Sequence, residues 1–151
     1  MACPYFCPTG KAEGFTWRSK IRPPLGDAHQ GECHVQPAQI HQPALEAIET
    51  CNLGYAAGRC SRFPANEGPD AVRFCIQADD GVAVSIDYVL ERRHLPDSHG
   101  RVVYDCGLQV FSGVDDGSLL QSQARAYVQS YLRWKQSGGV KTQKKVAAAK
   151  G

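Results

Sequence analysis

Cysteine is the residue type in this chain whose spacing could support chemistry. The 151 residues include seven cysteines, and Cys51 and Cys60 are separated by eight residues in a segment that contains two glycines. Cys33 lies upstream of them, and Cys3 and Cys7 lie at the start of the sequence. Cysteines clustered in this way bind metals more often than they form disulfides in a reducing compartment, so we expect these positions to supply one metal centre.

Four thiolates complete either a tetrahedral zinc site or a cubane iron–sulfur cluster. Structural zinc sites usually present two close pairs of cysteines, and only Cys3 and Cys7 fit that spacing. The wide separation of Cys33, Cys51 and Cys60 favours an iron–sulfur cluster, with 4Fe–4S as the first choice and zinc as the alternative. Five candidates for four positions leave Cys3 and Cys7 as competitors.

Five short motifs surround these cysteines: Cys3-Pro-Tyr-Phe, Pro24-Leu-Gly-Asp, Gly31-Glu-Cys, Cys51-Asn-Leu-Gly-Tyr and Cys60-Ser-Arg-Phe-Pro. They resemble the motifs of a group of uncharacterised bacterial proteins whose shared part is a four-cysteine N-terminal region. The resemblance is closest over residues 3–64 and implies the ligand set Cys3, Cys33, Cys51 and Cys60. Cys7 departs from the family pattern and remains a substitute ligand. The resemblance implies no established activity.

The remaining metal-ligating residue types are assigned less specific roles. His29 and His34 could each replace a thiolate, but their Gly- and Pro-rich surroundings are more typical of exposed loop histidines. Cys75 lies within a predicted strand, and Cys106 follows another. We interpret both as small structural residues without a catalytic role.

Composition and charge limit the classes of function. The chain is 42% hydrophobic and 21% charged, as in one ordinary globular domain. Residues 138–151 carry four lysines and no acid, so the formal charge of +2 leaves a net charge of −2 on residues 1–137. That balance gives little electrostatic support for nucleic-acid binding. The first ten residues lack the features of a signal peptide, and no apolar run reaches the roughly 20 residues of a membrane span, which predicts a cytoplasmic protein without membrane contact.

The pattern along the chain predicts an α+β fold in one domain over residues 1–137. Residues 1–64 form the metal-binding part, with an irregular Pro- and Gly-rich loop over 1–40 and a short helix over 43–51. Residues 65–137 form an antiparallel meander and a long helix. Residues 138–151 are predicted to be a flexible Lys-rich tail.

Alternating apolar residues predict strands over 71–78 and 82–90, joined at Asp80-Gly81, and further strands over 101–105 and 108–111. Three or four strands therefore form the meander, with a polar loop over 91–100. Ser118 is a suitable cap for an amphipathic helix over 118–136. The apolar face of that helix consists of Leu120, Ala124, Tyr127, Val128, Tyr131 and Leu132.

Three other functions remain open at this point, so the sequence does not decide whether the chain is an enzyme. A thiol-dependent or acid–base enzyme could use a reactive cysteine, or Glu91, His94, Asp97 and His99 of the polar loop. An interaction module stapled by zinc could bind a protein partner on the meander or the long helix. A nucleic-acid module could use the basic residues around Trp17, namely Arg18, Lys20 and Arg22, or the aromatic residues Tyr127, Tyr131 and Trp134.

Overall fold

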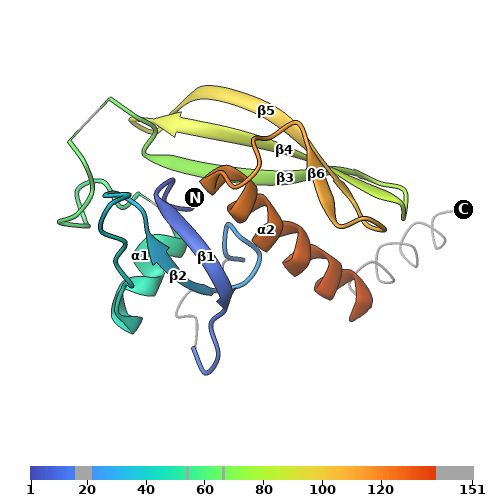
Figure 1. Cartoon of the computed structure of the whole chain (residues 1–151), viewed down its shortest axis with the longest axis horizontal. Coiled ribbons are helices and arrows are strands. Elements are labelled where there is room, and N and C mark those ends of the chain that lie inside the picture. Colours follow the sequence, from blue (N-terminus) through green and yellow to red (C-terminus); the bar gives the residue numbers. More distant parts are fainter. Residues whose placement is uncertain (16–21, 54, 66, 139–151) are drawn as a thin grey trace, which may run out of the picture.

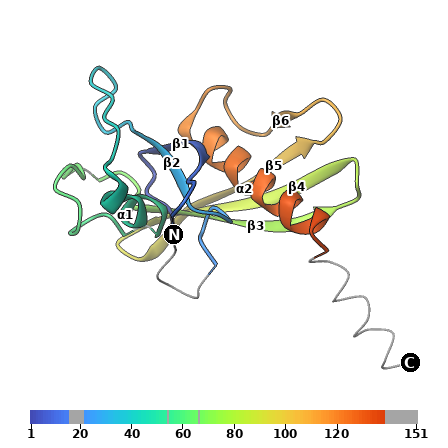
Figure 2. The same cartoon turned by 90° about the horizontal axis from the view of Figure 1, so that it is seen from below.

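The computed structural model describes residues 1–15, 22–53, 55–65 and 67–138, and within them the fold is α+β as predicted. A four-stranded sheet forms one layer, and a second layer on one of its faces contains the C-terminal helix α2, a two-stranded sheet and the short helix α1 (Figures 1 and 2). None of the helices in the described ranges is long and apolar enough to cross a membrane.

The large sheet is an antiparallel meander in the order β3 (Ala71–Asp79), β4 (Ala83–Arg92), β5 (Leu95–Asp105) and β6 (Val110–Ser112). Its alternating pattern sends one set of side chains into the core and the other set to solvent. The inward set is buried and includes Val72, Phe74, Val84, Ile86, Val102 and Tyr104. The predicted meander is therefore confirmed, and it has four strands.

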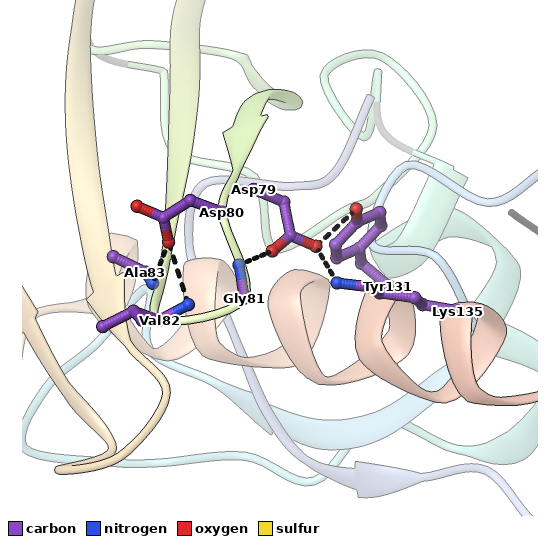
Figure 3. Close-up of polar contacts among 7 residues, drawn as sticks. All are labelled: Asp79, Asp80, Gly81, Val82, Ala83, Tyr131 and Lys135. Atoms are coloured by element: carbon purple, nitrogen blue, oxygen red, sulfur yellow. Dashed lines mark hydrogen bonds and ion pairs between the residues drawn. The ribbon is translucent and has the colours of Figure 1, made fainter.

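The turn between β3 and β4 is closed by two carboxylates (Figure 3). Asp80 Oδ1 accepts hydrogen bonds from the backbone N–H groups of Val82 and Ala83 at 2.9 and 2.8 Å, and Gly81 has the positive φ that such a turn requires. Asp79 Oδ1 accepts the N–H of Gly81 at 2.9 Å. The adjacent Asp-Asp-Gly residues thus fix the register of the hairpin, as the sequence predicts.

The predicted polar loop over 91–100 is wrong. β4 and β5 continue through this segment and are joined by a two-residue turn at Arg93 and His94, whose φ angles are 51° and 63°. Both residues occupy the left-handed region that usually favours glycine or asparagine. The alternation was obscured because Glu91, next to the turn, is an acid that is nevertheless only 5% exposed; it pairs with Arg73 on the face of the sheet opposite Leu90.

The predicted irregular loop over 1–40 is also wrong in part. β1 (Phe6–Lys11) and β2 (His29–Cys33) pair as an antiparallel two-stranded sheet. Gly31 permits this pairing, because a Cβ atom there would lie 2.1 Å from the Cys7 carbonyl oxygen and 2.8 Å from the Phe6 ring. Pro8 is tolerated because the register shifts next to it, between Pro8 and Gly10.

The predicted helices are confirmed with small changes of bounds. A 3-10 turn over Leu45–Ala47 leads into α1 (Ile48–Leu53), and α2 spans Leu119–Gln136. Ser118 caps α2, since its Oγ accepts the N–H of Gln121 at 3.1 Å. All six residues of the predicted apolar face of α2 belong to the core or pack against it.

Residues from both halves of the chain contribute to one core. The backbones of Ala2 and Val72 exchange hydrogen bonds of 2.8 and 2.9 Å, so the first residues run along the free edge of β3. The buried core includes Phe6 and Leu25 together with Val128 of α2. The predicted tail, residues 138–151, lies outside the described residues except for Gly138.

Candidate metal centre

The four expected ligand cysteines come from four separate segments. Cys3 lies in the turn before β1, Cys33 ends β2, Cys51 lies in α1, and Cys60 lies in the loop after α1. The first and third segments are tied together, because the Cys3 N–H donates to the Cys51 carbonyl at 3.0 Å. The Cys33 N–H donates to the His41 carbonyl at 2.7 Å, which fixes the end of β2.

The pKa values show that these four thiols are close neighbours. Burial, and to a smaller extent the nearby thiols of Cys3, Cys33 and Cys60, raise the pKa of Cys51 to about 12. Burial likewise raises the pKa of Cys3 to about 11; the Tyr5 and Phe6 backbones oppose this rise through hydrogen bonds, and Cys33 and Cys60 add to it. The thiols of all four segments therefore lie within electrostatic reach of one another.

This environment has a clear chemical consequence. A half-buried set of four sulfurs opposes its own ionisation, because each thiolate disfavours the next. At neutral pH the thiols of Cys3 and Cys51 stay protonated on their own, so neither has the lowered pKa of a reactive nucleophile. A bound cation would reverse this balance, because metal ligation deprotonates thiols.

The thiols do not already form a finished ion site. Among the residues that the structure describes, no group of three or more Cys, His, Asp or Glu side chains is arranged to hold a metal ion. A tetrahedral zinc ion would require sulfurs about 3.8 Å apart, given Zn–S bonds of about 2.3 Å. Occupation of the site by a metal would therefore require the cysteine side chains to move closer together.

Two buried amides position the cysteine segments, and the sequence analysis did not identify either of them. Asn52, next to Cys51, accepts the N–H of His29 and donates to the His29 carbonyl, both at 2.9 Å. It also donates to the carbonyl of Ile48 at 2.9 Å. Asn52 thus pairs with the β2 backbone as a strand neighbour would, and it joins α1 to β2.

Gln123 has the same role on α2. It is 1% exposed, and its Nε2 donates to the carbonyls of Cys3 and Phe6, each at 2.7 Å. The Phe6 N–H also donates to the Cys3 carbonyl at 3.1 Å, which closes the Cys3-Pro-Tyr-Phe turn. The sequence feature that could have identified Gln123 is its place among the apolar residues of the helix face, because a buried amide without a hydrogen-bond partner would be costly.

The other motif residues also have local roles. The Tyr5 and Phe63 rings pack edge to face with centroids 5.5 Å apart, so two cysteine motifs contact each other. Gly26 in the Pro-Leu-Gly-Asp motif has a φ of 86°, and a Cβ atom there would lie 2.4 Å from the Cβ of Ser130. Asp27 forms an ion pair with Arg133 of α2 at 2.7 Å. These contacts fix the second cysteine-containing segment to the C-terminal helix.

The placement of Cys7 favours Cys3 as the fourth ligand. Cys7 follows Phe6 on β1, and successive side chains of a strand point to opposite faces. Phe6 is buried in the core, so Cys7 points away from it and stands opposite Glu32 in the ladder.

The histidines differ from the exposed loop residues that the sequence predicted. His29 is 3% exposed, and burial lowers its pKa, so the ring stays neutral. His34 is partly buried, and its Nε2 lies 3.2 Å from Glu32. Of the two remaining cysteines, Cys75 is exposed on the outer face of β3 and is not the buried residue that we expected. Burial and, to a smaller extent, the negative charge of Asp79 raise the pKa of Cys106, which is unfavourable for a nucleophile.

Two of the residues considered for acid–base chemistry, Glu91 and His94, contact Tyr55. Its hydroxyl donates to Glu91 Oε2 at 3.1 Å, and Arg73 lies 3.6 Å from Glu91 Oε1. The ring of His94 packs on the Tyr55 ring with centroids 4.4 Å apart. Of the other two candidates, Asp97 pairs with Arg92 at 3.3 Å, and His99 stands opposite Val89 in the ladder.

A cavity of about 630 Å³ lies between the loop after α1 and the β4–β5 turn. Cys60 and Phe63 form part of one wall, and Arg92 and Leu95 form part of the other. One member of the thiol group is therefore next to a space large enough for a small molecule.

The described residues give the nucleic-acid hypothesis little support. Tyr127 stacks on Phe74 at 5.5 Å, and Tyr131 donates to Asp79 at 2.8 Å, so neither ring forms an open platform. The guanidinium of Arg22 lies 5.2 Å from the centre of the Trp134 ring. Trp17, Arg18 and Lys20 lie outside the described residues.

No protein-family model, curated protein or solved structure matches the chain. The function is therefore inferred from the residues of this chain alone.

Proposed function

We propose that Cys3, Cys33, Cys51 and Cys60 bind one metal centre, an iron–sulfur cluster of the 4Fe–4S type. The observation that carries this proposal is the juxtaposition of the four cysteine segments: the Cys3 N–H donates to the Cys51 carbonyl at 3.0 Å, and Cys33 and Cys60 lie near enough to affect the ionisation of both thiols. The donor set fits, because four thiolates are the ligands of such clusters. When bound, the cluster would supply both the positive charge that the buried thiols lack and the capacity to take up one electron.

The residues of the chain perform the structural part of this function. Asn52 and Gln123 hold the backbones next to Cys51 and Cys3, so two ligands are positioned before any metal arrives. The Tyr5 and Phe63 rings pack between the Cys3 and Cys60 motifs. The centre would then cross-link four segments of residues 1–64.

Anaerobic purification tests the proposal. We expect a brown protein with absorption near about 400 nm and about four iron and four sulfide ions per chain. Cys51→Ser and Cys60→Ser should each reduce bound iron at least tenfold, whereas Cys75→Ser, the matched control on β3, should retain it. A colourless protein with one zinc per chain would replace the cluster by zinc, and a protein that binds neither metal would contradict the proposal.

The same preparation distinguishes Cys3 from Cys7. Cys3→Ser should lose the cluster, and Cys7→Ser should keep it, because Cys7 points away from the face occupied by Phe6. The reverse result would assign Cys7 as the fourth ligand.

A further inference from the structure

β1 packs against α2 (Figure 1). A second cavity, of about 280 Å³, lies along the seam between them. Three cationic residues line it: Lys11 from β1, and Arg125 and Arg133 from α2. Its lining, taken over the described residues, contains no Asp or Glu. A concave site with three positive charges and no acid in its wall attracts anions.

The cations differ in how far their charge is already used. Arg133 forms an ion pair with Asp27 at 2.7 Å, and it also donates to Ser130. Arg125 lies 5.1 Å from the centre of the Phe111 ring and donates to the Gln109 carbonyl at 3.3 Å, neither of which is a charged partner. Lys11 has no ion pair with any described residue. Lys11 and Arg125 therefore form no direct ion pair with the described residues, although the Asp27 carboxylate lies within electrostatic reach of Lys11.

Local backbone and side-chain features also point to a ligand. The register of β1 shifts around Thr9, which has no partner in the ladder and lines the cavity. Bulges of this kind often occur beside binding sites, because they redirect backbone and side-chain groups. His29 also lines the cavity, is 3% exposed, and has a buried Nδ1 without a hydrogen-bond partner. A buried ring nitrogen without a partner is costly unless a ligand or water satisfies it.

We propose that this seam cavity binds the phosphate group of a small ligand through Lys11, Arg125 and Arg133. A doubly charged phosphate matches the two cations without an ion pair, Lys11 and Arg125, better than a carboxylate does. Guanidinium groups also bind two phosphate oxygens at once through parallel hydrogen bonds. The volume lies just below the roughly 300 to 1,000 Å³ of typical small-molecule pockets, so it suits a phosphate and a small attached group. This site contains none of the four cysteines and does not depend on the metal centre.

Calorimetry at fixed ionic strength, with the full chain as purified anaerobically, tests the site. Inorganic phosphate and pyrophosphate are the probes, and sodium acetate and a single-stranded oligonucleotide are the comparisons. We expect both phosphate probes to bind, with acetate at least tenfold weaker. Phosphate should also shift the His29 ring signals in NMR spectra. Equal binding of acetate, or binding of the oligonucleotide without binding of phosphate, would overturn the proposal.

Variants assign the binding to this cavity. Lys11→Gln and Arg125→Gln should each weaken phosphate binding about tenfold. Arg62→Gln, which removes the same charge from an exposed position outside the cavity, should leave it unchanged. If Arg125→Gln disturbs folding, as judged by circular dichroism, Gln129→Ala replaces it, because Gln129 is an exposed residue of the same wall. Unchanged binding in Lys11→Gln and in Arg125→Gln, or in its replacement Gln129→Ala, would contradict the assignment.

Discussion

The four-stranded sheet with α2 and the cysteine region of residues 1–64 are stabilised in different ways. The sheet buries alternating apolar side chains against one helix face, and its turns are closed by adjacent residues such as Asp80. The cysteine region has short strands and a short helix, and buried amides hold its backbone. The sheet is therefore specified mainly by local pattern and hydrophobic burial, whereas the cysteine region depends on a few long-range polar contacts.

This difference explains why the two regions should respond differently to substitution. In the sheet, the loss of one contact is shared among many apolar neighbours. In the cysteine region, the removal of one amide leaves several buried backbone groups without partners. The following predictions test this contrast, from the largest expected effect to the smallest.

Asn52→Ala should have the largest effect on stability, about 3 kcal/mol or more. The substitution leaves the N–H and carbonyl of His29 and the carbonyl of Ile48 without the bonds that Asn52 provides. Chemical denaturation measures the loss, and hydrogen exchange should show that protection falls in β2 and α1 before it falls in β3–β5. A uniform loss of protection would mean that the two regions unfold as one unit.

Gln123→Leu should cost about 2 kcal/mol, although leucine is a good helix former. The carbonyls of Cys3 and Phe6 would lose a buried donor, and burial of a leucine would offset part of that loss. Gln129→Leu on the exposed face of α2 is the control and should change the free energy of unfolding by less than about 0.5 kcal/mol. An equal effect of both substitutions would show that the Gln123 amide does not position Cys3.

Without metal, the cysteine region should lose stability at alkaline pH. The pKa values of Cys3 and Cys51 rise from 9.0 to about 11 and about 12 on folding, so the folded state holds these protons more tightly. Their contribution to stability is complete below pH 9 and is lost as the pH rises through these values. The apparent melting temperature of chelator-treated, reduced protein should fall between about pH 9 and pH 11, and that of Cys51→Ala should fall less. An equal fall in both proteins would contradict this linkage.

Lys135→Met should have a small effect, about 1 kcal/mol, because the sheet does not depend on one polar contact. Lys135 donates to Asp79 at 2.6 Å, and together with Tyr131 it lowers the pKa of Asp79 despite partial burial (Figure 3). Arg101→Met breaks the more exposed pair with Asp87 and should cost less. Denaturant midpoints compare the two variants, and a loss above about 3 kcal/mol for Lys135→Met would remove the contrast between the regions.

The accuracy of the sequence predictions follows the same division. The strands over β3–β4 and the helix α2 were predictable, because their apolar periodicity and turn residues lie within short windows. The pairing of β1 with β2 was not, because Pro8 and Gly31 obscure the strand pattern and the reason for Gly31 is a contact with Phe6. The continuation of β4 into the predicted loop was missed because Glu91, an acid, occupies a buried position.

The sequence by itself determined the α+β class, the meander, the capped helix and the residue types available as metal ligands, because each depends on neighbours within a few positions. Tertiary structure alone decided that Cys3, Cys33, Cys51 and Cys60 share one environment, and that Lys11 of β1 and Arg125 of α2 line one cavity. The physical reason is that these residues are distant in the sequence and are brought together by long-range contacts, such as those of Asn52 with His29 and of Gln123 with Cys3. No local pattern encodes such a contact.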